Sequence, residues 1–240
     1  HGCYRFISII ECMQPTPRGS EMQDILIYSD SLTWGIIPNT RRRLSFTQRW
    51  PGVFEAELKA AGYPVKILEN CLNGRRTVWS DPYKDGRDGS QGFAQVLEMH
   101  APLKLVVIML GTNDFQTTHN NDAWMSAQGM LKLINIIRTA PIEPGMPVPD
   151  ILIISPPMMQ QPKGPLVQKF KGGVHRSVGL AGELQLISDT QQCYFFDAAS
   201  VTDASAVDGI HLDAPQHVVL GQAVAKALID FSILQNQTRI

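Results

Sequence analysis

The stretch that decides the fold is Asp24-Ile25-Leu26-Ile27-Tyr28, which is followed at once by Ser29-Asp30-Ser31-Leu32-Thr33-Trp34-Gly35. A short apolar run of this kind is typical of a strand that is buried on both faces of a sheet. When such a strand ends in a small polar turn, the turn lies at the carboxyl edge of the sheet, where open α/β folds bind ligands. Ser31 is therefore a candidate nucleophile.

Four further strand-like runs follow, at residues 65–69, 105–110, 151–155 and 194–197. Segments with helical spacing of apolar residues alternate with them, at residues 50–61, 121–138, 174–188 and 214–234. This alternation predicts an α/β fold with a five-stranded parallel sheet, right-handed crossovers and helices on both faces. Long connections follow the strand ends at residues 35–49, 70–92 and 156–173. Long structured loops of this kind are commonly functional.

A second polar motif, Asp208-Gly209-Ile210-His211, lies near the far end of the chain. Its imidazole and carboxylate, three residues apart, supply a base and an acid that orients it. Taken alone, Asp208 is equally well read as a loop cap and His211 as an ordinary loop histidine. Taken with Ser31, they supply the three parts of a nucleophilic hydrolase.

Two more strand ends carry residues that suit the stabilisation of an oxyanion. Gly74 follows the run at residues 65–69, and Asn113 follows the run at residues 105–110. A glycine backbone approaches a ligand closely, and an asparagine side chain offers an amide donor. Each of the two is, by itself, more typical of a turn. Their convergence with Ser31 on one sheet edge favours ester cleavage.

The four blocks together resemble the SGNH/GDSL hydrolase family, and several strings are similar to its arylesterase/acyltransferase branch. The strings are Ser31-Leu32-Thr33-Trp34-Gly35, Arg49-Trp50-Pro51-Gly52-Val53, Val107-Ile108-Met109-Leu110-Gly111-Thr112-Asn113-Asp114 and Val207-Asp208-Gly209-Ile210-His211-Leu212. The resemblance implies a flavodoxin-like three-layer α/β/α sandwich, the SGNH hydrolase fold, with no metal and no organic cofactor. It also implies a serine esterase for short-chain aryl or alkyl esters, with acyl transfer to alcohols as a further activity.

The resemblance assigns a role to each matching residue. Ser31 would be the nucleophile, His211 the general base and Asp208 the acid that orients the imidazole. The oxyanion would accept hydrogen bonds from the backbone N–H groups of Ser31 and Gly74 and from the side-chain amide of Asn113. The ester would then be cleaved through an acyl-serine intermediate.

One position departs from the family pattern, because Ser29 stands where the first block normally begins with glycine. If the turn requires a positive φ at this position, the serine adds strain there. The chemistry depends on Asp30 and Ser31 more than on residue 29, so we expect activity to survive.

Substrate selection is expected to depend on apolar side chains around the nucleophile. The candidates are Leu32, Trp34, Met158 and Phe170. Apolar walls with few polar groups are typical of small-molecule sites, although such residues also pack under loops or in subunit interfaces. The resemblance suggests homo-oligomers whose neighbouring subunits narrow the entrance, which would favour short acyl chains and let an alcohol compete with water.

Two alternatives stay open. A carbohydrate acetyl esterase, or deacetylase, would use the same residues but would have open subsites lined by aromatic and polar side chains. A non-catalytic flavodoxin-like binding module would keep the fold and lose the chemistry. A chain that had lost the catalytic function would be expected to lack at least one of the candidate catalytic or oxyanion-binding residues, and all five are present.

The amino-acid composition indicates which binding partners and which cellular compartment to expect. The 240 residues carry 21 basic and 22 acidic side chains and a net charge of -1. This balance provides no electrostatic footprint for nucleic acid or for an anionic membrane. The four cysteines lack the spacing of a metal or redox site, and we expect a cytoplasmic protein with free thiols. Residues 1–21 are expected to form an N-terminal extension before a single domain at residues 22–240.

Overall fold

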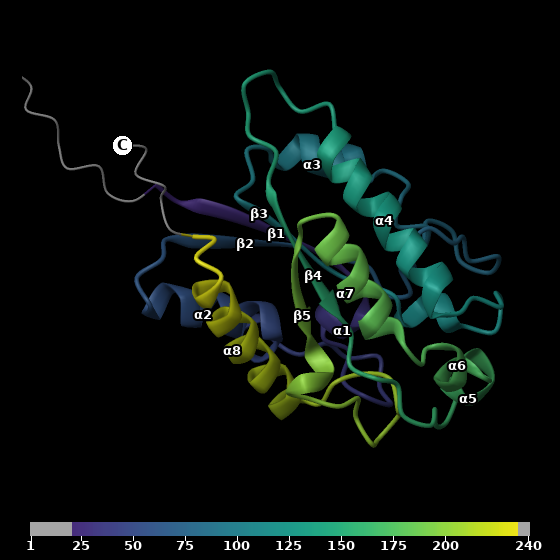
Figure 1. Ribbon diagram of the computed structural model, residues 1–240. Helices are drawn as coiled ribbons and strands as arrows, with labels where there is room; N and C mark the ends of the chain where they lie inside the picture. The colour runs from purple at the N-terminus through teal and green to yellow at the C-terminus, as the bar shows by residue number, and fades with distance from the viewer. Residues whose placement is uncertain (1–20, 235–240) are drawn as a thin grey trace, which may run out of the picture.

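The five expected strands form one parallel sheet in the computed structural model, which describes residues 21–234. The strands are β1 (Gln23–Ser29), β2 (Val65–Cys71), β3 (Leu105–Met109), β4 (Asp150–Ser155) and β5 (Tyr194–Asp197). Their spatial order is β2-β1-β3-β4-β5, and every neighbouring pair is parallel (Figure 1). The predicted flavodoxin-like α/β fold is confirmed. The strand order reverses between β1 and β3, which is where folds of this type bind ligands.

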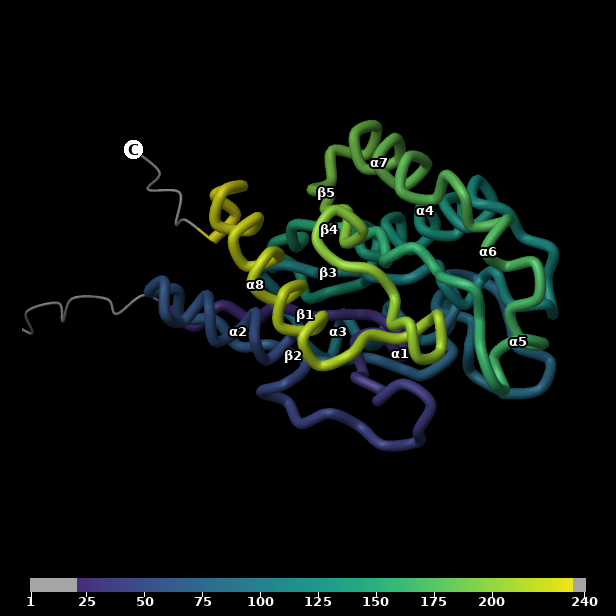
Figure 2. The backbone as a smooth tube through the Cα atoms, turned by 90° about the horizontal axis from the view of Figure 1, so that it is seen from below, coloured from purple at the N-terminus to yellow at the C-terminus, as the bar shows by residue number. Residues whose placement is uncertain are grey.

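Helices cover both faces of the sheet, as Figures 1 and 2 show. The longer ones are α2 (Trp50–Ala60), α3 (Phe93–His100), α4 (Ala123–Thr139), α7 (Leu180–Thr190) and α8 (Ala214–Asp230). Helices α2 and α8 pack on one face, and α3, α4 and α7 pack on the other. Short helical turns lie at α1 (Ser31–Trp34), η2 (Thr112–Phe115), α5 (Leu166–Lys169) and α6 (Gly173–Arg176).

Strand β1 shows why the apolar runs are continuous instead of alternating. Leu26 and Tyr28 belong to the core under α3, α4 and α7, whereas Ile25 and Ile27 belong to the core under α2 and α8. Successive side chains of a strand point to opposite faces, so a strand covered on both sides needs apolar residues throughout. The sheet therefore supplies a rigid base for the loops at its carboxyl edge.

The helix boundaries differ from the predicted ones at three places. The segment predicted at residues 174–188 forms two helices, because Gly179 adopts φ +92° between α6 and α7. Helix α8 ends at Asp230, four residues before the predicted end. Helix α3 was not predicted, since it has only eight residues and lies behind a long loop. The expected N-terminal extension lies almost entirely outside the described residues.

The long loops gather at the carboxyl edge of the sheet. Figure 2 shows the segment that follows β5 passing close to α1, although the two are far apart in the sequence. A hydrogen bond from the backbone N–H of Asn39 to Asp208 Oδ2 (3.4 Å) joins this segment to the loop that follows α1. Within residues 21–234, every helix is too short or too polar to cross a membrane.

Candidate active site

Ser31 lies in a tight turn that begins as soon as β1 ends. Asp30 caps this turn, and its Oδ1 accepts a hydrogen bond from the backbone N–H of Leu32 (2.9 Å). Gly35 closes the turn in a left-handed conformation (φ +83°), and its N–H donates to the carbonyl oxygen of Ser31 (3.1 Å). Aspartate is a preferred residue at a helix N-cap and glycine at a C-cap. The local sequence therefore fixes Ser31, which is 6% exposed, at the carboxyl edge of β1.

Ser29 is free of the strain that a positive φ would impose. It is the last residue of β1, pairs with Cys71 and Met109, and does not have a left-handed backbone. Its fully buried hydroxyl donates to the carbonyl oxygen of Met109 (2.6 Å) and accepts from Thr33 Oγ1 (2.6 Å). Trp50 Nε1 in turn donates to Thr33 Oγ1 (3.1 Å). The Ser29 hydroxyl thus links the turn that contains Ser31 to β3 and, through Thr33, to α2.

Asn113 lies in η2, just beyond the end of β3, and contacts Asp30, the residue before Ser31. Its Nδ2 donates to Asp30 Oδ2 (2.9 Å), while its Oδ1 accepts from Gln116 Nε2 (2.7 Å). An amide nitrogen carries two hydrogens, so one stays available for a ligand. Complete burial raises the pKa of the Asp30 carboxyl to about 7, against the lowering effects of the Leu32 N–H, the charge of His211 and the Asn113 hydrogen bond.

Gly74 lies in the loop after β2, in a left-handed conformation (φ +85°) that favours glycine. Its backbone N–H has no acceptor within the described residues. Arg75 holds this loop against β1, because its Nη1 donates to the carbonyl oxygens of Ser29 (2.9 Å) and Asn70 (2.5 Å). The Arg75 guanidinium also stacks on the ring of Tyr28, 3.9 Å from its centroid. Arg75 therefore links the loop that contains Gly74 to the end of β1, directly before the turn that contains Ser31.

Asp208 and His211 form a hydrogen-bonded pair after β5. His211 Nδ1 lies 2.7 Å from Asp208 Oδ2, and Asp208 Oδ1 accepts from the backbone N–H groups of Ile210 and His211 (both 2.9 Å). Burial acts to raise the pKa of the Asp208 carboxyl, but the hydrogen bond and charge of His211, together with these N–H groups, outweigh it and lower the pKa to about 2. Asp208 is therefore an anion that orients the imidazole.

Gly209 allows the motif to turn tightly between its two polar residues. It has φ +82°, and a Cβ atom at this position would lie 2.4 Å from the carbonyl oxygen of Gln161. The backbone N–H of Gln160 donates to the Gly209 carbonyl (2.9 Å), and that of Lys163 donates to the Asp208 carbonyl (3.0 Å). The loop after β4 thus supports the Asp208–His211 pair.

The structure brings the predicted residues to one edge of the sheet, in two groups. The first contains the Ser31 turn, Gly74 and Asn113, joined through Asp30 and Arg75 as described above. The second contains Asp208 and His211, whose ring is near enough for its charge to act on the pKa of Asp30. Within the described residues the Ser31 hydroxyl makes no hydrogen bond to His211. The imidazole keeps Nε2 free on the side away from Asp208.

The predicted pocket residues have different environments. Leu32 (2% exposed) and Phe170 (3% exposed) pack in the two apolar cores, on opposite faces of the sheet, so the expectation that they line a pocket is corrected. Trp34 is partly exposed and contacts the Arg43 guanidinium, 4.7 Å from its ring centroid. Met158 is 55% exposed and lines an apolar cavity of about 100 Å³ beside Thr112.

The sequence interpretation missed two residues that organise this edge, Arg75 and Gln116. Both are buried in the structure, and the available signal was their position in the sequence, directly after Gly74 and three residues after Asn113. Their positions depend on contacts with β1 and with the Asn113 side chain, and periodicity carries no information about such contacts.

A flavodoxin-like sheet with a capped serine after its first strand and an aspartate–histidine pair after its last is the arrangement expected of a serine hydrolase. The family model of the GDSL-like lipase/acylhydrolase family matches residues 30–218, and the chain belongs to this family. Comparison with curated proteins found no significant match.

Solved structures of esterases have the same fold. Est24, a carbohydrate acetylesterase from Sinorhizobium meliloti, is 33% identical, with a TM-score of 0.82 over 87% of this chain and 99% of its own. The inhibitor-bound aryl esterase of M. smegmatis is 31% identical, with a TM-score of 0.82 over the same shares of the two chains. A lipase/acylhydrolase from Enterococcus faecalis, 16% identical over 87% of this chain and 96% of its own, shares the fold with a TM-score of 0.60. This chain is an ester hydrolase.

Proposed function

We propose that the chain hydrolyses short-chain carboxylic esters through an acyl-serine intermediate on Ser31. His211 Nε2 takes the proton of the Ser31 hydroxyl as the oxygen attacks the ester carbonyl carbon. The tetrahedral oxyanion accepts hydrogen bonds from the N–H groups of Ser31 and Gly74 and from Asn113 Nδ2. Collapse breaks the bond to the alcohol oxygen, which leaves with the proton from His211.

The second half of the reaction repeats these steps with water. His211 takes a proton from the water as its oxygen attacks the acyl-serine carbonyl. Collapse of the second tetrahedral intermediate releases the carboxylic acid and returns the proton to Ser31. An alcohol in place of the water gives a new ester, so acyl transfer needs no additional group.

One observation carries this proposal: the 2.7 Å hydrogen bond between Asp208 Oδ2 and His211 Nδ1. A neutral imidazole that donates through Nδ1 presents an unprotonated Nε2, the atom that a general base requires. The link from Asn113 to Asp30 places an amide donor beside the nucleophile turn. These two arrangements would supply the base and an oxyanion donor from segments that are far apart in the sequence.

The size of the cavity beside His211 supports a preference for small substrates. This cavity has a volume of about 190 Å³ and is lined by Ile36, Thr40, Leu166 and His211, among others. A volume below the usual range of ligand pockets favours short acyl groups over long chains. A restricted site also lets an alcohol compete with water for the acyl-enzyme.

A second candidate function is the removal of acetyl groups from saccharides. The observation that favours it is the similarity to the Sinorhizobium meliloti structure, whose title names a carbohydrate acetylesterase. The two functions use the same residues and differ in the alcohol part of the ester. Activity on an acetylated saccharide that exceeds activity on simple aryl acetates would favour this alternative.

The test is a series of aryl esters with acyl chains of increasing length, assayed with the unmodified protein, with Ser31→Ala and with Ser200→Ala as an exposed control. We expect acetate and propionate esters to react fastest, Ser31→Ala to be inactive and Ser200→Ala to be unchanged. Retained turnover in Ser31→Ala would reject the mechanism. Adding an alcohol and comparing ester with free acid tests acyl transfer, which fails if only the acid forms.

A further inference from the structure

Helix α5 contributes to two cavities at the carboxyl edge of the sheet. Leu166, at its start, lines the cavity of about 190 Å³ that contains His211 and Asp208. Gln168 and Lys169, at its end, line a second cavity of about 530 Å³. The second cavity is large enough for a group that extends from an ester bound at the first.

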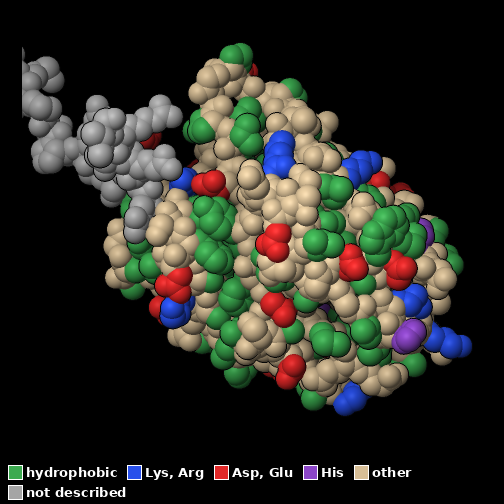
Figure 3. Space-filling view, viewed as in Figure 1, with side chains coloured by type: hydrophobic (Ala, Val, Ile, Leu, Met, Phe, Trp, Pro, Cys, Tyr) green, Lys and Arg blue, Asp and Glu red, His purple; other side chains and the backbone are tan. Residues whose placement is uncertain are grey.

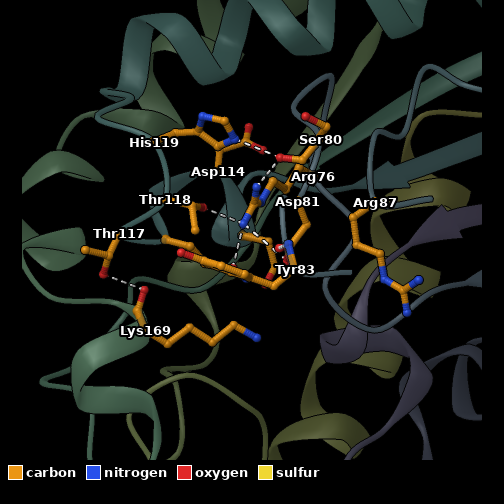
Figure 4. Close-up of polar contacts among 12 residues, drawn as sticks. Arg76, Ser80, Asp81, Tyr83, Arg87, Asp114, Thr117, Thr118, His119 and Lys169 are labelled. Atoms are coloured by element: carbon orange, nitrogen blue, oxygen red, sulfur yellow. Dashed lines mark hydrogen bonds and ion pairs between the residues drawn. The ribbon is translucent and has the colours of Figure 1, made fainter. Parts of the chain in front are cut away.

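The second cavity is joined to the proposed oxyanion donor by hydrogen bonds. Gln116 lines this cavity and donates to Asn113 Oδ1 (2.7 Å). The backbone N–H and the hydroxyl of Thr117, the next residue, donate to the carbonyl oxygen of Lys169 (2.8 and 2.9 Å). Lys169 is therefore held by the segment that positions Asn113, as the contact between Thr117 and Lys169 in Figure 4 shows.

The acidic side chains of both cavities already have basic side chains as partners. Asp81, in the second cavity, lies 3.4 Å from Nη2 of the fully buried Arg76 (Figure 4). The same nitrogen donates to Gln116 Oε1 (2.7 Å), which fixes Arg76 behind the cavity wall. Asp208, in the first cavity, accepts from His211. Both carboxylates are therefore held by these partners, and neither forms a salt bridge with a lysine at the cavities.

Four cations at these cavities form no salt bridge with an acidic side chain among residues 21–234. Lys84 and Lys169 line the second cavity, and Arg41 and Lys163 line the first. Lys163 is already held, because its Nζ donates to the carbonyl oxygen of Ala206 (2.6 Å). Burial lowers the pKa of both lysines, and neighbouring cations lower it further: Arg87 and Arg41 act on Lys84, and Lys84, Arg76 and Arg41 act on Lys169. The charge of Asp81 acts in the opposite direction on both lysines without outweighing these effects. These side chains therefore lie near one another and repel.

The cluster contrasts with the chain as a whole, which has a net charge of -1. Figure 3 shows Lys and Arg side chains at the end of the molecule where α5 and α6 lie in Figure 1. Like charges brought together without counter-charges destabilise a fold, and an anionic ligand removes that cost. Such a cluster beside a reactive site also attracts anionic substrates and raises their rate of association.

We propose that the preferred ester carries a carboxylate on its alcohol part, and that Lys84 and Lys169, with Arg41, bind this carboxylate while the scissile carbonyl lies at Ser31. The inference rests on the proposed function and defines its substrate class. Lysine ammonium groups are point charges on flexible side chains. They should therefore select for the negative charge of the substrate and tolerate variation in the shape of its alcohol part.

The test compares two substrates that differ mainly in charge, 4-acetoxybenzoate and 4-acetoxybenzamide. Both are acetate esters of a para-substituted phenol, and only the first is an anion at neutral pH. The variant is the double substitution Lys84→Gln/Lys169→Gln. The matched control is Lys66→Gln/Lys132→Gln, which makes the same change in net charge at two exposed residues that line neither cavity.

We expect the unmodified protein to prefer 4-acetoxybenzoate, and the Lys84→Gln/Lys169→Gln variant to raise its KM about five- to tenfold, the size of two partly exposed ion pairs. The constants for 4-acetoxybenzamide should stay the same, and the control should match the unmodified protein. Added salt should reduce the preference for the anion, since it screens exposed charges.

The outcomes separate this inference from the proposed function. Ser31-dependent hydrolysis of both esters without a preference for the anion, or with equal losses in the variant and the control, would overturn the inference and leave the esterase proposal intact. Absence of hydrolysis of either ester would overturn both. A KM effect that is confined to the anion and to the Lys84→Gln/Lys169→Gln variant would support the inference.

Discussion

Asn113 donates an amide hydrogen to the carboxylate of Asp30 across 2.9 Å, and so ties the turn after β3 to the residue that precedes Ser31. Gln116 donates to the other end of the Asn113 amide, which fixes the orientation of that side chain. Strands β1 and β3 are neighbours at the point where the strand order reverses. The contact therefore sets one proposed oxyanion donor against the nucleophile before a substrate arrives, and such preorganisation is a main source of catalytic rate.

The first prediction concerns Asn113→Ala. It removes the side-chain donor while the N–H groups of Ser31 and Gly74 remain, so we expect kcat to fall by about 10²–10³ with a small change in KM. Steady-state kinetics on a short-chain aryl acetate measure this effect. A variant that loses affinity for substrate but keeps its kcat would show that Asn113 binds the ground state instead.

The second prediction concerns Asp208→Asn and the pH profile. Within the described residues Asp208 is the hydrogen-bond partner of the His211 ring, so no backbone carbonyl replaces it. We expect a large loss, on the order of 10⁴ in kcat, as in other Ser-His-Asp sites, and steady-state kinetics on a short-chain aryl acetate measure it.

The pH profile of the unmodified protein follows from the same pair. The pKa of Asp208 is about 2, so its carboxylate stays ionised throughout the assay range. We therefore expect that protonation of Asp208 does not limit activity at any pH well above 2, and kcat/KM measured as a function of pH checks this. A loss of activity that is present in the unmodified protein near the ordinary aspartate pKa of about 3.9, and absent from Asp208→Asn, would contradict the lowered pKa of Asp208.

The sequence predicted the strands and most helices, because their signal is local. The spacing of apolar residues in the run before Ser31 and in α4 is enough to predict which of their side chains are buried. Leu32 was predicted to line the pocket because it is an apolar residue close to Ser31, but the direction of a side chain in a short turn depends on what packs beneath it. Arg75 and Gln116 escaped notice for a similar reason, since both act on distant segments.

Other expectations from the sequence stay predictions. Kinetic measurements on variants test the roles of Ser31, Asp208 and His211. Sedimentation in solution measures the number of subunits. The cytoplasmic compartment and the absence of nucleic-acid or membrane partners rest on composition, which describes the chain but not its surroundings. Acyl transfer rests on the resemblance to one branch of the family.

The third prediction compares Ser29→Gly with Ser29→Ala. Both remove the hydroxyl that links Thr33 to the carbonyl of Met109, and both leave the buried Thr33 hydroxyl without its acceptor. An unsatisfied buried group costs about 1–3 kcal/mol, and glycine in a strand adds about 0.5–1 kcal/mol of backbone entropy. Urea unfolding should therefore rank the serine protein above Ser29→Ala and Ser29→Gly last. A more stable Ser29→Gly protein would show that Ser29 strains the turn.

The fourth prediction concerns stability against pH and the buried Asp114. Its carboxyl accepts hydrogen bonds from Thr77 N (2.9 Å), Thr77 Oγ1 (2.8 Å) and Ser126 Oγ (2.6 Å). Burial raises its pKa to about 6, against the lowering effect of these hydrogen bonds. In the unfolded chain an aspartate has a pKa of about 3.9. Between these two values the folded protein binds more protons than the unfolded chain.

Stability should therefore fall as pH rises through that interval, because the slope of the unfolding free energy follows the difference in bound protons. Asp30, with a pKa of about 7, acts in the same direction, whereas Asp208 acts in the opposite direction and only at lower pH.

Urea unfolding of the unmodified protein, Asp114→Asn and the exposed control Asp203→Asn at several pH values between about 4 and 7 measures the effect. The decline should become smaller in Asp114→Asn, by about 1–3 kcal/mol across the interval, and stay the same in the control. Because the asparagine cannot titrate, an unchanged decline in Asp114→Asn would assign the pH dependence to other groups.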